Sequence, residues 1–286
     1  MTKVLVLGST GMLGSMVHGY LRKSGVAEVV GTRREQFDAE AFASGVPQPQ
    51  PLDADYVVNC IGVIKPFCKD TDPAGVRRAI AVNAVFPHRL AAAAAAKGAR
   101  VIQIATDCVY SGARGEYVES DPHDALDVYG KTKSLGEVFE GPVLNVRCSI
   151  IGPELKNHLS LLDWFLGNKD GAEVNGFTHH LWNGVTTLQF AKLCETVVRT
   201  PGLFDRLLKT SHLHHFVPNS SVNKYELLNL MNDAFGRKVR VRPVGDVGPR
   251  VDRTLSSKHA MLREVYPSRT MADALSELAA YLREAR

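Results

Sequence analysis

A glycine-spaced turn near the start of the chain most constrains what it can fold into. The apolar run KVLVLG (3–8) leads directly into GSTGMLG (8–14), a GxxGxxG pattern that opens the helical segment MLGSMVHGYLRKSG (12–25). Glycines at this spacing let the chain turn tightly, bring its backbone close to a pyrophosphate and pack the helix against the strand. The helix N-terminus also favours the phosphate charge. The turn therefore predicts a dinucleotide site formed by Gly8, Thr10, Gly11, Met12, Leu13 and Gly14.

The rest of the first half repeats this alternation of strand and helix. Further strands are expected at EVVGTRR (28–34), ADYVVNCIG (54–62), ARVIQIATDCVYSG (99–112, with its exit loop) and GPVLNVRCSIIGP (141–153), and a long helix is expected over 72–98. Such repetition is typical of a parallel sheet covered by helices on both faces. We therefore predict an α/β fold, a Rossmann-type doubly wound parallel sheet, over residues 1–152.

After residue 152 the regular alternation of expected strands and helices ends. Amphipathic helices are expected at 159–168, 186–199, 223–236 and 271–285, with short strands near 213–218 and 238–244. These segments predict a smaller, mainly helical C-terminal substrate lobe over 153–286, with some of them returning to the first domain.

Composition narrows the class of protein. The chain has 286 residues and a net charge of +4 without a long basic run, so we expect no nucleic-acid partner. The first apolar run is too short for a signal peptide, and no stretch approaches the roughly 18 apolar residues of a membrane span. The five cysteines are odd in number and lack CxxC spacing. The cysteines indicate reduced thiols in a cytoplasmic protein. Without a long apolar stretch, no membrane association is expected.

The end of the second strand bears on cofactor choice. An NAD site usually has an acidic residue there to bind the ribose 2′-hydroxyl, whereas this chain has Arg33 and Arg34. Two guanidinium groups can accept a 2′-phosphate, so NADPH is predicted, with NADH as the alternative if the arginines are simply solvated. Asp53, just before the third strand, is a candidate for the adenine amino group, although such aspartates often only cap a turn.

Three residues with acid–base and hydrogen-bonding side chains follow the fourth strand. Thr106 stands at its carboxyl end, where ligands bind in open α/β sheets. Tyr129 and Lys133, in DVYGKTKSLGE (127–137), are one helical turn apart and leave the same face. A nearby ammonium is expected to lower the pKa of the tyrosine, which can then donate a proton near neutral pH. Thr106 would orient the substrate oxygen.

With these motifs the chain resembles an extended short-chain dehydrogenase/reductase acting on a nucleotide-activated sugar. Within that superfamily it is most similar to the dTDP-4-dehydrorhamnose reductase family, through GSTGMLG (8–14), VVNCIG (57–62), VNA (82–84), ATDCVYSG (105–112), YGKTK (129–133) and VRCSIIGP (146–153). The resemblance implies Thr106, Tyr129 and Lys133 as the catalytic triad. Tyr129 and Lys133 would also contact the cofactor, with Cys60, Ile61 and Gly62 flanking it. Asn83 would support the active-site strand.

This chain departs from the family pattern at some positions, and these departures limit which properties of the family we expect here. Dehydratases of the superfamily place an acidic pair after the threonine, but here Asp107 is followed by Cys108, which argues for reduction or epimerisation. Ser15 stands where the rhamnose reductases have a glutamate associated with a metal at a dimer contact. No metal is therefore predicted, and a homodimer is expected only because dimers are common for such folds.

Substrate contacts are the least constrained part of the sequence. Asp107 and Cys108, beside the triad, are expected at the substrate. Candidates for the sugar nucleotide, between the lobes, are Lys65, Asn157, Trp182, Asn183, Arg250 and Arg253. Four of them have a structural alternative: Asn157 as a helix cap, Trp182 as core, and the two arginines as surface ion pairs. The paired histidines at 179–180 and 214–215 lack carboxylates or cysteines at ligand spacing.

Three functions are consistent with the sequence. The first is NAD(P)H-dependent reduction of a nucleotide-linked 4-keto-6-deoxysugar, with hydride delivered to C4. The second is a nucleotide-sugar epimerase that retains its cofactor. The third is a non-catalytic, NADP-binding regulatory subunit on the same fold, although a binding module needs no proton donor.

Overall fold

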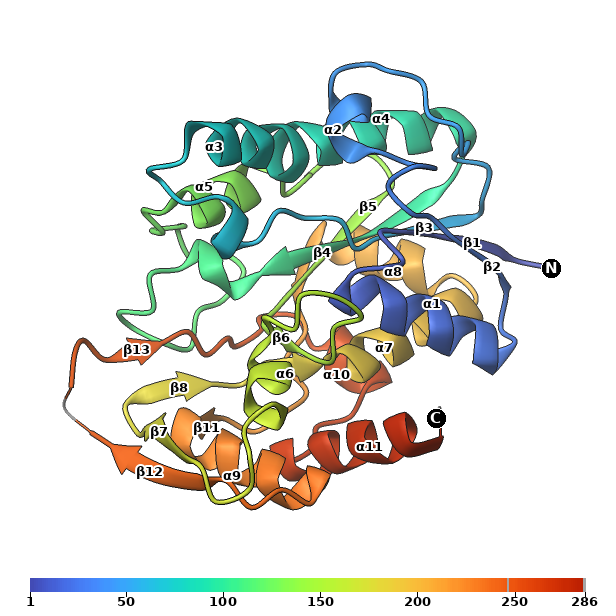
Figure 1. Cartoon of the computed structure of the whole chain (residues 1–286). Helices are drawn as coiled ribbons and strands as arrows, with labels where there is room; N and C mark the ends of the chain where they lie inside the picture. Colours follow the sequence, from blue (N-terminus) through green and yellow to red (C-terminus); the bar gives the residue numbers. More distant parts are fainter. Residues whose placement is uncertain (246, 285–286) are drawn as a thin grey trace.

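The computed structural model describes residues 1–245 and 247–284 and is built around one six-stranded parallel sheet (Figure 1). Its strands run in the order β2-β1-β3-β4-β5-β10, and each neighbouring pair is parallel. They are β1 (Lys3–Leu7), β2 (Glu28–Gly31), β3 (Tyr56–Asn59), β4 (Arg100–Thr106), β5 (Val143–Cys148) and β10 (Leu213–His215). The chain changes direction across the sheet at β1 and β3. In open α/β sheets ligands bind beside such a point, at the carboxyl ends of the strands.

Alternating side chains of each strand form two cores, one on either face of the sheet. Val4 and Val6 of β1 belong to one core, and Leu5 and Leu7 belong to the other. This is the period of two that a strand imposes. One face is covered by α1 (Met12–Ser24), α7 (Thr187–Arg199) and α8 (Leu203–Thr210), the other by α2 (Ala39–Ala43), α3 (Pro73–Ala79), α4 (Phe86–Lys97) and α5 (Val128–Leu135) (Figure 1). The predicted doubly wound α/β fold is confirmed.

The predicted long helix contains an irregular turn. Between α3 and α4 lies a π-helical segment, η2 (Ile80–Val85), so the helix runs without a break over Pro73–Lys97. By length and composition alone this 25-residue helix could span a membrane, but half of its most apolar window is buried in the fold. Single π turns often mark functional sites.

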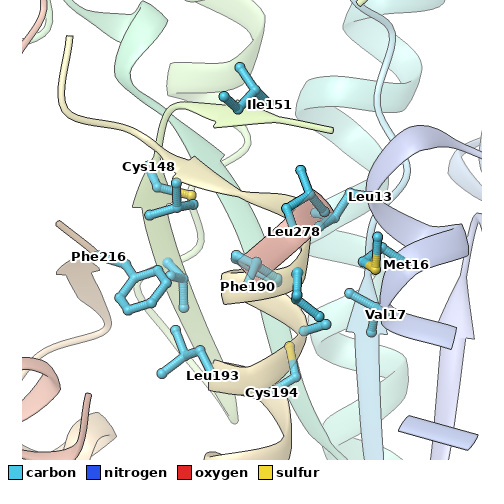
Figure 2. Packing of buried hydrophobic residues seen from close by; sticks show 14 of the residues in the cluster. Leu13, Met16, Val17, Cys148, Ile151, Phe190, Leu193, Cys194, Phe216 and Leu278 are labelled. Atoms are coloured by element: carbon cyan, nitrogen blue, oxygen red, sulfur yellow. The ribbon is translucent and has the colours of Figure 1, made fainter. Parts of the chain in front are cut away.

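The second half of the chain shares a core with the first. Leu13, Met16 and Val17 of α1 belong to the same buried cluster as Phe190 and Leu193 of α7 (Figure 2). The predicted strand at 213–218 is β10, which pairs with β5 and extends the main sheet. Parts of the later sequence therefore complete the first domain.

The remaining elements form a smaller layer below the main sheet in Figure 1. Two small sheets, β11-β8-β13 and β12-β7, lie with the helices of this lobe, and β6 pairs with β9. Their bounds are β6 (Ile150–Ile151), α6 (Leu161–Leu166), β7 (Glu173–Phe177), β8 (His180–Trp182), β9 (Val185–Thr186), β11 (Val222–Asn223), α9 (Lys224–Phe235), β12 (Arg240–Val244), β13 (Val251–Asp252), α10 (Met261–Val265) and α11 (Met271–Glu284).

The structure corrects one expectation about these elements and adds strands that were not expected. The strand predicted over 141–153 breaks at Ser149, because β6 leaves the main sheet to pair with β9. The short strands β7, β8, β9, β11 and β13 were not predicted. The last expected helix ran to residue 285, which lies outside the described residues.

Candidate active site

The glycine turn between β1 and α1 has the geometry of a phosphate cradle. Gly8 has φ +78°, a conformation that favours glycine, and the Gly11 N–H donates to its carbonyl at 3.0 Å. A Cβ on Gly14 would lie 2.1 Å from the Gly8 carbonyl oxygen, so this glycine permits close packing of helix and strand. No side chain caps the N-terminus of α1. The first backbone N–H groups of the helix can therefore bind an anion.

A cavity of about 210 Å³ opens beside this turn, between the ends of β1, β2 and β3. Its lining includes eight of the predicted cofactor residues: Gly8, Thr10, Gly11, Arg33, Arg34, Cys60, Ile61 and Gly62. The two arginines differ in their surroundings. Arg34 pairs with Asp38 at 2.8 Å and with Glu40 at 3.4 Å, whereas Arg33 pairs with no carboxylate among residues 1–245 and 247–284. Arg33 is thus the guanidinium better placed for an added anion.

Asp53 lies elsewhere. Its carboxylate accepts from the Lys3 ammonium at 3.0 Å and is largely exposed. Lys3 begins β1, so this ion pair stands at the amino edge of the sheet, opposite the edge that carries the glycine turn. Asp53 lines neither of the cavities there, and we remove it from the candidate cofactor contacts.

A second cavity of about 680 Å³ continues from the first along the carboxyl ends of β3, β4 and β5. Thr106, Tyr129 and Lys133 all line it, together with Met12 and Leu13 from the glycine turn. The predicted substrate residues Asp107, Cys108 and Asn157 line it too. One continuous hollow therefore joins the predicted phosphate cradle to the predicted triad.

The helix α5 fixes the Tyr–Lys pair. Asp127 caps it by accepting from the Gly130 N–H at 2.7 Å, and a Cβ on Gly136 at its other end would lie 1.8 Å from the Asn83 carbonyl oxygen. Lys133 is buried, and its ammonium donates to the Ile104 carbonyl of β4 at 3.1 Å. The helix is thus held at both ends, with Lys133 anchored on the strand that carries Thr106.

The electrostatics of the pair differ from the expectation. Burial raises the pKa of Tyr129, the nearby Cys108 raises it further, and a hydrogen bond with Thr106 lowers it. The charge of Lys133 is not among the main effects on the pKa of Tyr129. Burial lowers the pKa of Lys133 to about 8, opposed by the charge of Glu137. In the protein alone, Tyr129 is therefore a firmly protonated phenol beside a lysine that remains cationic at neutral pH.

Asp107 is a buried carboxyl beside the threonine. Burial raises its pKa, while the charge of Arg253 and hydrogen bonds from Ser149, Thr106 and Cys108 lower it. The Thr106 hydroxyl lies 3.2 Å from its carboxyl oxygen. Asp107 and Thr106 therefore form one polar pair at the wall of the second cavity.

Asn83 supports a different element from the one expected. It lies in the π-helical segment, where its side chain accepts from the Val63 N–H at 2.8 Å and donates to the Val63 carbonyl at 2.9 Å. Its amide also donates to Thr132 of α5 at 3.3 Å. Asn83 therefore joins α5 to the loop after β3, which lines both cavities, rather than to the strand that carries Thr106.

Two of the predicted substrate residues lie near the second cavity but do not line it. Lys65 pairs with Asp127 at 2.8 Å, and its ammonium is 5.8 Å from the centre of the Tyr129 ring. Arg253 donates to the backbone carbonyls of Tyr110 at 3.0 Å and Ser111 at 3.1 Å. Lys65 thus lies near Tyr129, and Arg253 is held by the backbone that follows β4.

The other three substrate candidates have structural partners. Trp182 is buried in the main core, against Gly184, so base stacking is removed from its candidate roles. Asn183 bonds both backbone groups of Leu255, at 2.7 and 2.9 Å. Arg250 pairs with Asp252 at 3.2 Å. Asn183 and Arg250 line a separate cavity of about 600 Å³ beside β13.

Two cationic residues near the site were not predicted. Arg78 of α3 lines both cavities and lies 3.7 Å from Glu40. Lys224 begins α9, is half-buried and has its ammonium 5.7 Å from the centre of the Trp182 ring. Burial lowers the pKa of Lys224, opposed by the charges of Asp107 and Cys108. Neither residue belongs to a motif, so only the fold could reveal them.

Comparison with known proteins gives a consistent picture. Residues 1–146 match the family described as RmlD substrate binding domain. The dTDP-4-dehydrorhamnose reductase of Streptomyces griseus is 36% identical over 136 residues, which are 46% of this chain and 43% of that protein. Methionine adenosyltransferase 2 subunit beta of Rattus norvegicus is 33% identical over 144 residues, 47% of this chain and 41% of that protein. The match thus spans less than half the length of these curated relatives.

The likeness of the fold extends over the whole chain. The crystal structure of dTDP-4-dehydrorhamnose reductase from Bacillus anthracis in complex with NADP superimposes with a TM-score of 0.74, covering 100% of both chains at 16% identity. The family match covers just over half of this chain, residues 1–146 of 286. The chain therefore belongs to the RmlD family of extended short-chain dehydrogenase/reductases, the dTDP-4-dehydrorhamnose reductase family that the sequence motifs predicted.

Proposed function

We propose that the protein is an NADPH-dependent reductase of a nucleotide-linked 4-keto-6-deoxysugar. The observation that carries this proposal is that Thr106, Tyr129 and Lys133 line one cavity, which continues into the cavity at the glycine turn. Family membership supports the same reaction, because relatives named dTDP-4-dehydrorhamnose reductase match the half of the chain that holds these residues.

The residues present fit a phosphorylated dinucleotide. The turn at Gly8 and Gly14 leaves no room for a Cβ at its closest approach, and its N–H groups would hold the pyrophosphate. Arg33 would bind the 2′-phosphate, because its guanidinium has no competing carboxylate in the described part of the chain. The neighbour from Bacillus anthracis was solved with NADP. When bound, the reduced nicotinamide supplies the hydride.

Each residue of the triad has a separate role in the proposed reaction. Thr106 donates a hydrogen bond to the C4 carbonyl oxygen and orients it. Tyr129 gives its phenolic proton to that oxygen, and its raised pKa keeps it in the protonated form that a donor needs before transfer. Lys133 holds the cofactor ribose and places its positive charge beside the developing phenolate. Asp107 lines the same cavity and would contact the sugar.

The test is a Tyr129→Phe variant assayed with dTDP-linked 4-keto-6-deoxysugars by the loss of NADPH absorbance. We expect turnover to fall by about 100-fold or more, while the dissociation constant for NADPH stays unchanged. Tyr56→Phe, a half-buried tyrosine on β3 away from both cavities, is the matched control. Near-normal turnover of the Tyr129→Phe variant would overturn the assignment.

A regulatory subunit is the second candidate, because methionine adenosyltransferase 2 subunit beta is also a relative. A binding module would hold NADPH tightly and reduce none of the sugars in a panel of dTDP-, UDP-, GDP- and CDP-linked substrates. An epimerase would convert its substrate without net consumption of NADPH. Net oxidation of NADPH in proportion to product distinguishes the reductase from both.

A further inference from the structure

Arg78 of α3 is a cation at the two joined cavities to which the proposed function gives no role. Of the charged residues that line these cavities in residues 1–245 and 247–284, Arg78 alone lines both. Thr10 and Gly11 of the glycine turn line both cavities too. Arg33 lines the first cavity, and the triad lines the second. Arg78 therefore lies at the junction, between the end that holds Arg33 and the end that holds the triad.

The helix that carries Arg78 is anchored at two points. A Cβ on Gly75, in α3, would lie 2.7 Å from the Phe67 carbonyl oxygen, so the helix approaches this backbone closely. The helix continues into η2, where the side chain of Asn83 bonds both backbone groups of Val63. Phe67 and Val63 themselves line the second cavity. The backbone of α3 is thus fixed against the cavity wall.

The direction of the Arg78 side chain follows from its position on the helix. Val82 lies about one turn further along the same continuous helix, and both residues line the first cavity. Arg77, the preceding residue, is exposed and lines neither cavity. The two adjacent arginines therefore differ in whether the side chain reaches the cavities, and Arg77 is a matched control for Arg78.

The guanidinium of Arg78 is free to bind a ligand. In the described part of the chain it donates no hydrogen bond, and its ion pair with Glu40 joins Nε and Oε2 at 3.7 Å. Glu40 also pairs with Arg34, at 3.4 Å. The Arg78 side chain is 44% exposed, and exposed ion pairs contribute little to stability. An anion at the junction therefore meets no strong competitor for this guanidinium.

The junction holds the other groups that favour a phosphate. Gly11 begins α1 without a side-chain cap, and Met12 and Leu13, the first residues of this helix, line the second cavity. Backbone N–H groups at a helix N-terminus and a planar guanidinium both bind phosphate oxygens. A dinucleotide with its 2′-phosphate at Arg33 and its nicotinamide at the triad has its pyrophosphate between them, at this junction.

We propose that Arg78 binds the pyrophosphate of the bound dinucleotide from the side opposite the glycine turn. The two helices α1 and α3 cover opposite faces of the sheet (Figure 1), so the pyrophosphate is held between the N-terminus of one and a side chain of the other. This role rests on the NADPH site of the proposed function and adds a contact to it. NADPH and NADH share the pyrophosphate, so Arg78 contributes to the affinity for both, whereas Arg33 distinguishes between them.

The test is a titration of the protein with NADPH and with NADH in the absence of sugar, followed by the fluorescence of the reduced nicotinamide. We expect Arg78→Ala to weaken the binding of both by the same factor, about tenfold or more. Arg77→Ala should leave both dissociation constants unchanged. Arg78→Lys, which keeps the charge but loses the planar fork, should lose less than Arg78→Ala. A loss in Arg78→Ala no larger than that in Arg77→Ala would overturn the proposal.

Two other results would contradict the proposal by giving Arg78 a different ligand. A loss of affinity for NADPH alone is the pattern expected of Arg33→Ala and would mean that Arg78 binds the 2′-phosphate. A loss of affinity for dTDP alone, measured by calorimetry, would mean that Arg78 binds the diphosphate of the sugar nucleotide. Because Arg78 is exposed, the ligand-free Arg78→Ala variant should unfold at the same temperature as the unaltered protein.

Measuring affinity without sugar keeps this inference apart from the proposed function. Equal losses for NADPH and NADH in a protein that reduces no sugar would support the role of Arg78 and refute the reductase. An active reductase whose affinity for both dinucleotides does not respond to Arg78→Ala would refute the role of Arg78 alone. An unaltered protein that binds neither dinucleotide would refute both.

Discussion

The glycine turn and the segment from Trp182 to Arg253 were both predicted to bind ligands, but their residues have different surroundings in the structure. Every residue predicted at the turn lies at the wall of one of the two joined cavities except Gly14, which packs the helix onto the strand. In the later segment, Trp182 is core, Asn183 holds a neighbouring backbone and Arg250 is paired with Asp252. The turn works through its backbone, which seven consecutive residues determine. The later residues depend on partners that lie far away in the sequence.

The largest expected effect tests the core role of Trp182. Removing a buried tryptophan side chain leaves a large cavity, so Trp182→Ala should lower the free energy of unfolding by about 3–5 kcal/mol. The measurement is denaturant unfolding, with KM for the sugar nucleotide determined on the folded fraction. Trp182→Phe, the control, should recover part of the stability and leave KM unchanged. A large rise in KM with little loss of stability would show that Trp182 binds substrate and would remove the contrast between the two regions.

A smaller effect is expected within α1, where two glycines have opposite surroundings. A Cβ at Gly14 would meet the backbone of Gly8 at 2.1 Å, whereas a Cβ at Gly19 meets nothing within 4 Å. Gly14→Ala should lower the free energy of unfolding by about 1–3 kcal/mol and weaken NADPH binding, because the cradle must open. Gly19→Ala in the same helix should raise it by about 0.5–1 kcal/mol. Equal effects of the two substitutions on unfolding would contradict the packing role of Gly14.

The sequence predicted those features that local patterns determine. Buried apolar runs identified β1, β3 and β4, and the one-turn spacing of Tyr129 and Lys133 placed both at the cavity. It could not predict that β6 leaves the sheet at Ser149, because its partner β9 is more than 30 residues away in the chain. Nor could it predict the electrostatics of Tyr129, since the dominant effect on its pKa is burial by residues from several elements. Arg78 and Lys224 were missed because nothing in their local sequence differs from an ordinary helical surface.

The last prediction compares Arg33 and Arg34, which are neighbours in sequence but have different partners in space. It tests whether the surroundings of a side chain decide its role in cofactor binding. Arg34 is held by Asp38 and Glu40, while Arg33 is exposed and pairs with no carboxylate in the described part of the chain. A charge-assisted contact contributes about 1.5–3 kcal/mol, so Arg33→Ala should weaken NADPH binding by about 10- to 100-fold. The affinity for NADH, which lacks the 2′-phosphate, should not change. Arg34→Ala is the matched control and should weaken NADPH binding less, because Asp38 and Glu40 already engage its guanidinium. Equal losses of NADPH affinity in both variants would mean that position in the sequence, rather than the spatial surroundings of each arginine, determines cofactor choice. The cofactor contacts of these side chains could then be predicted from sequence as well as those of the glycine turn.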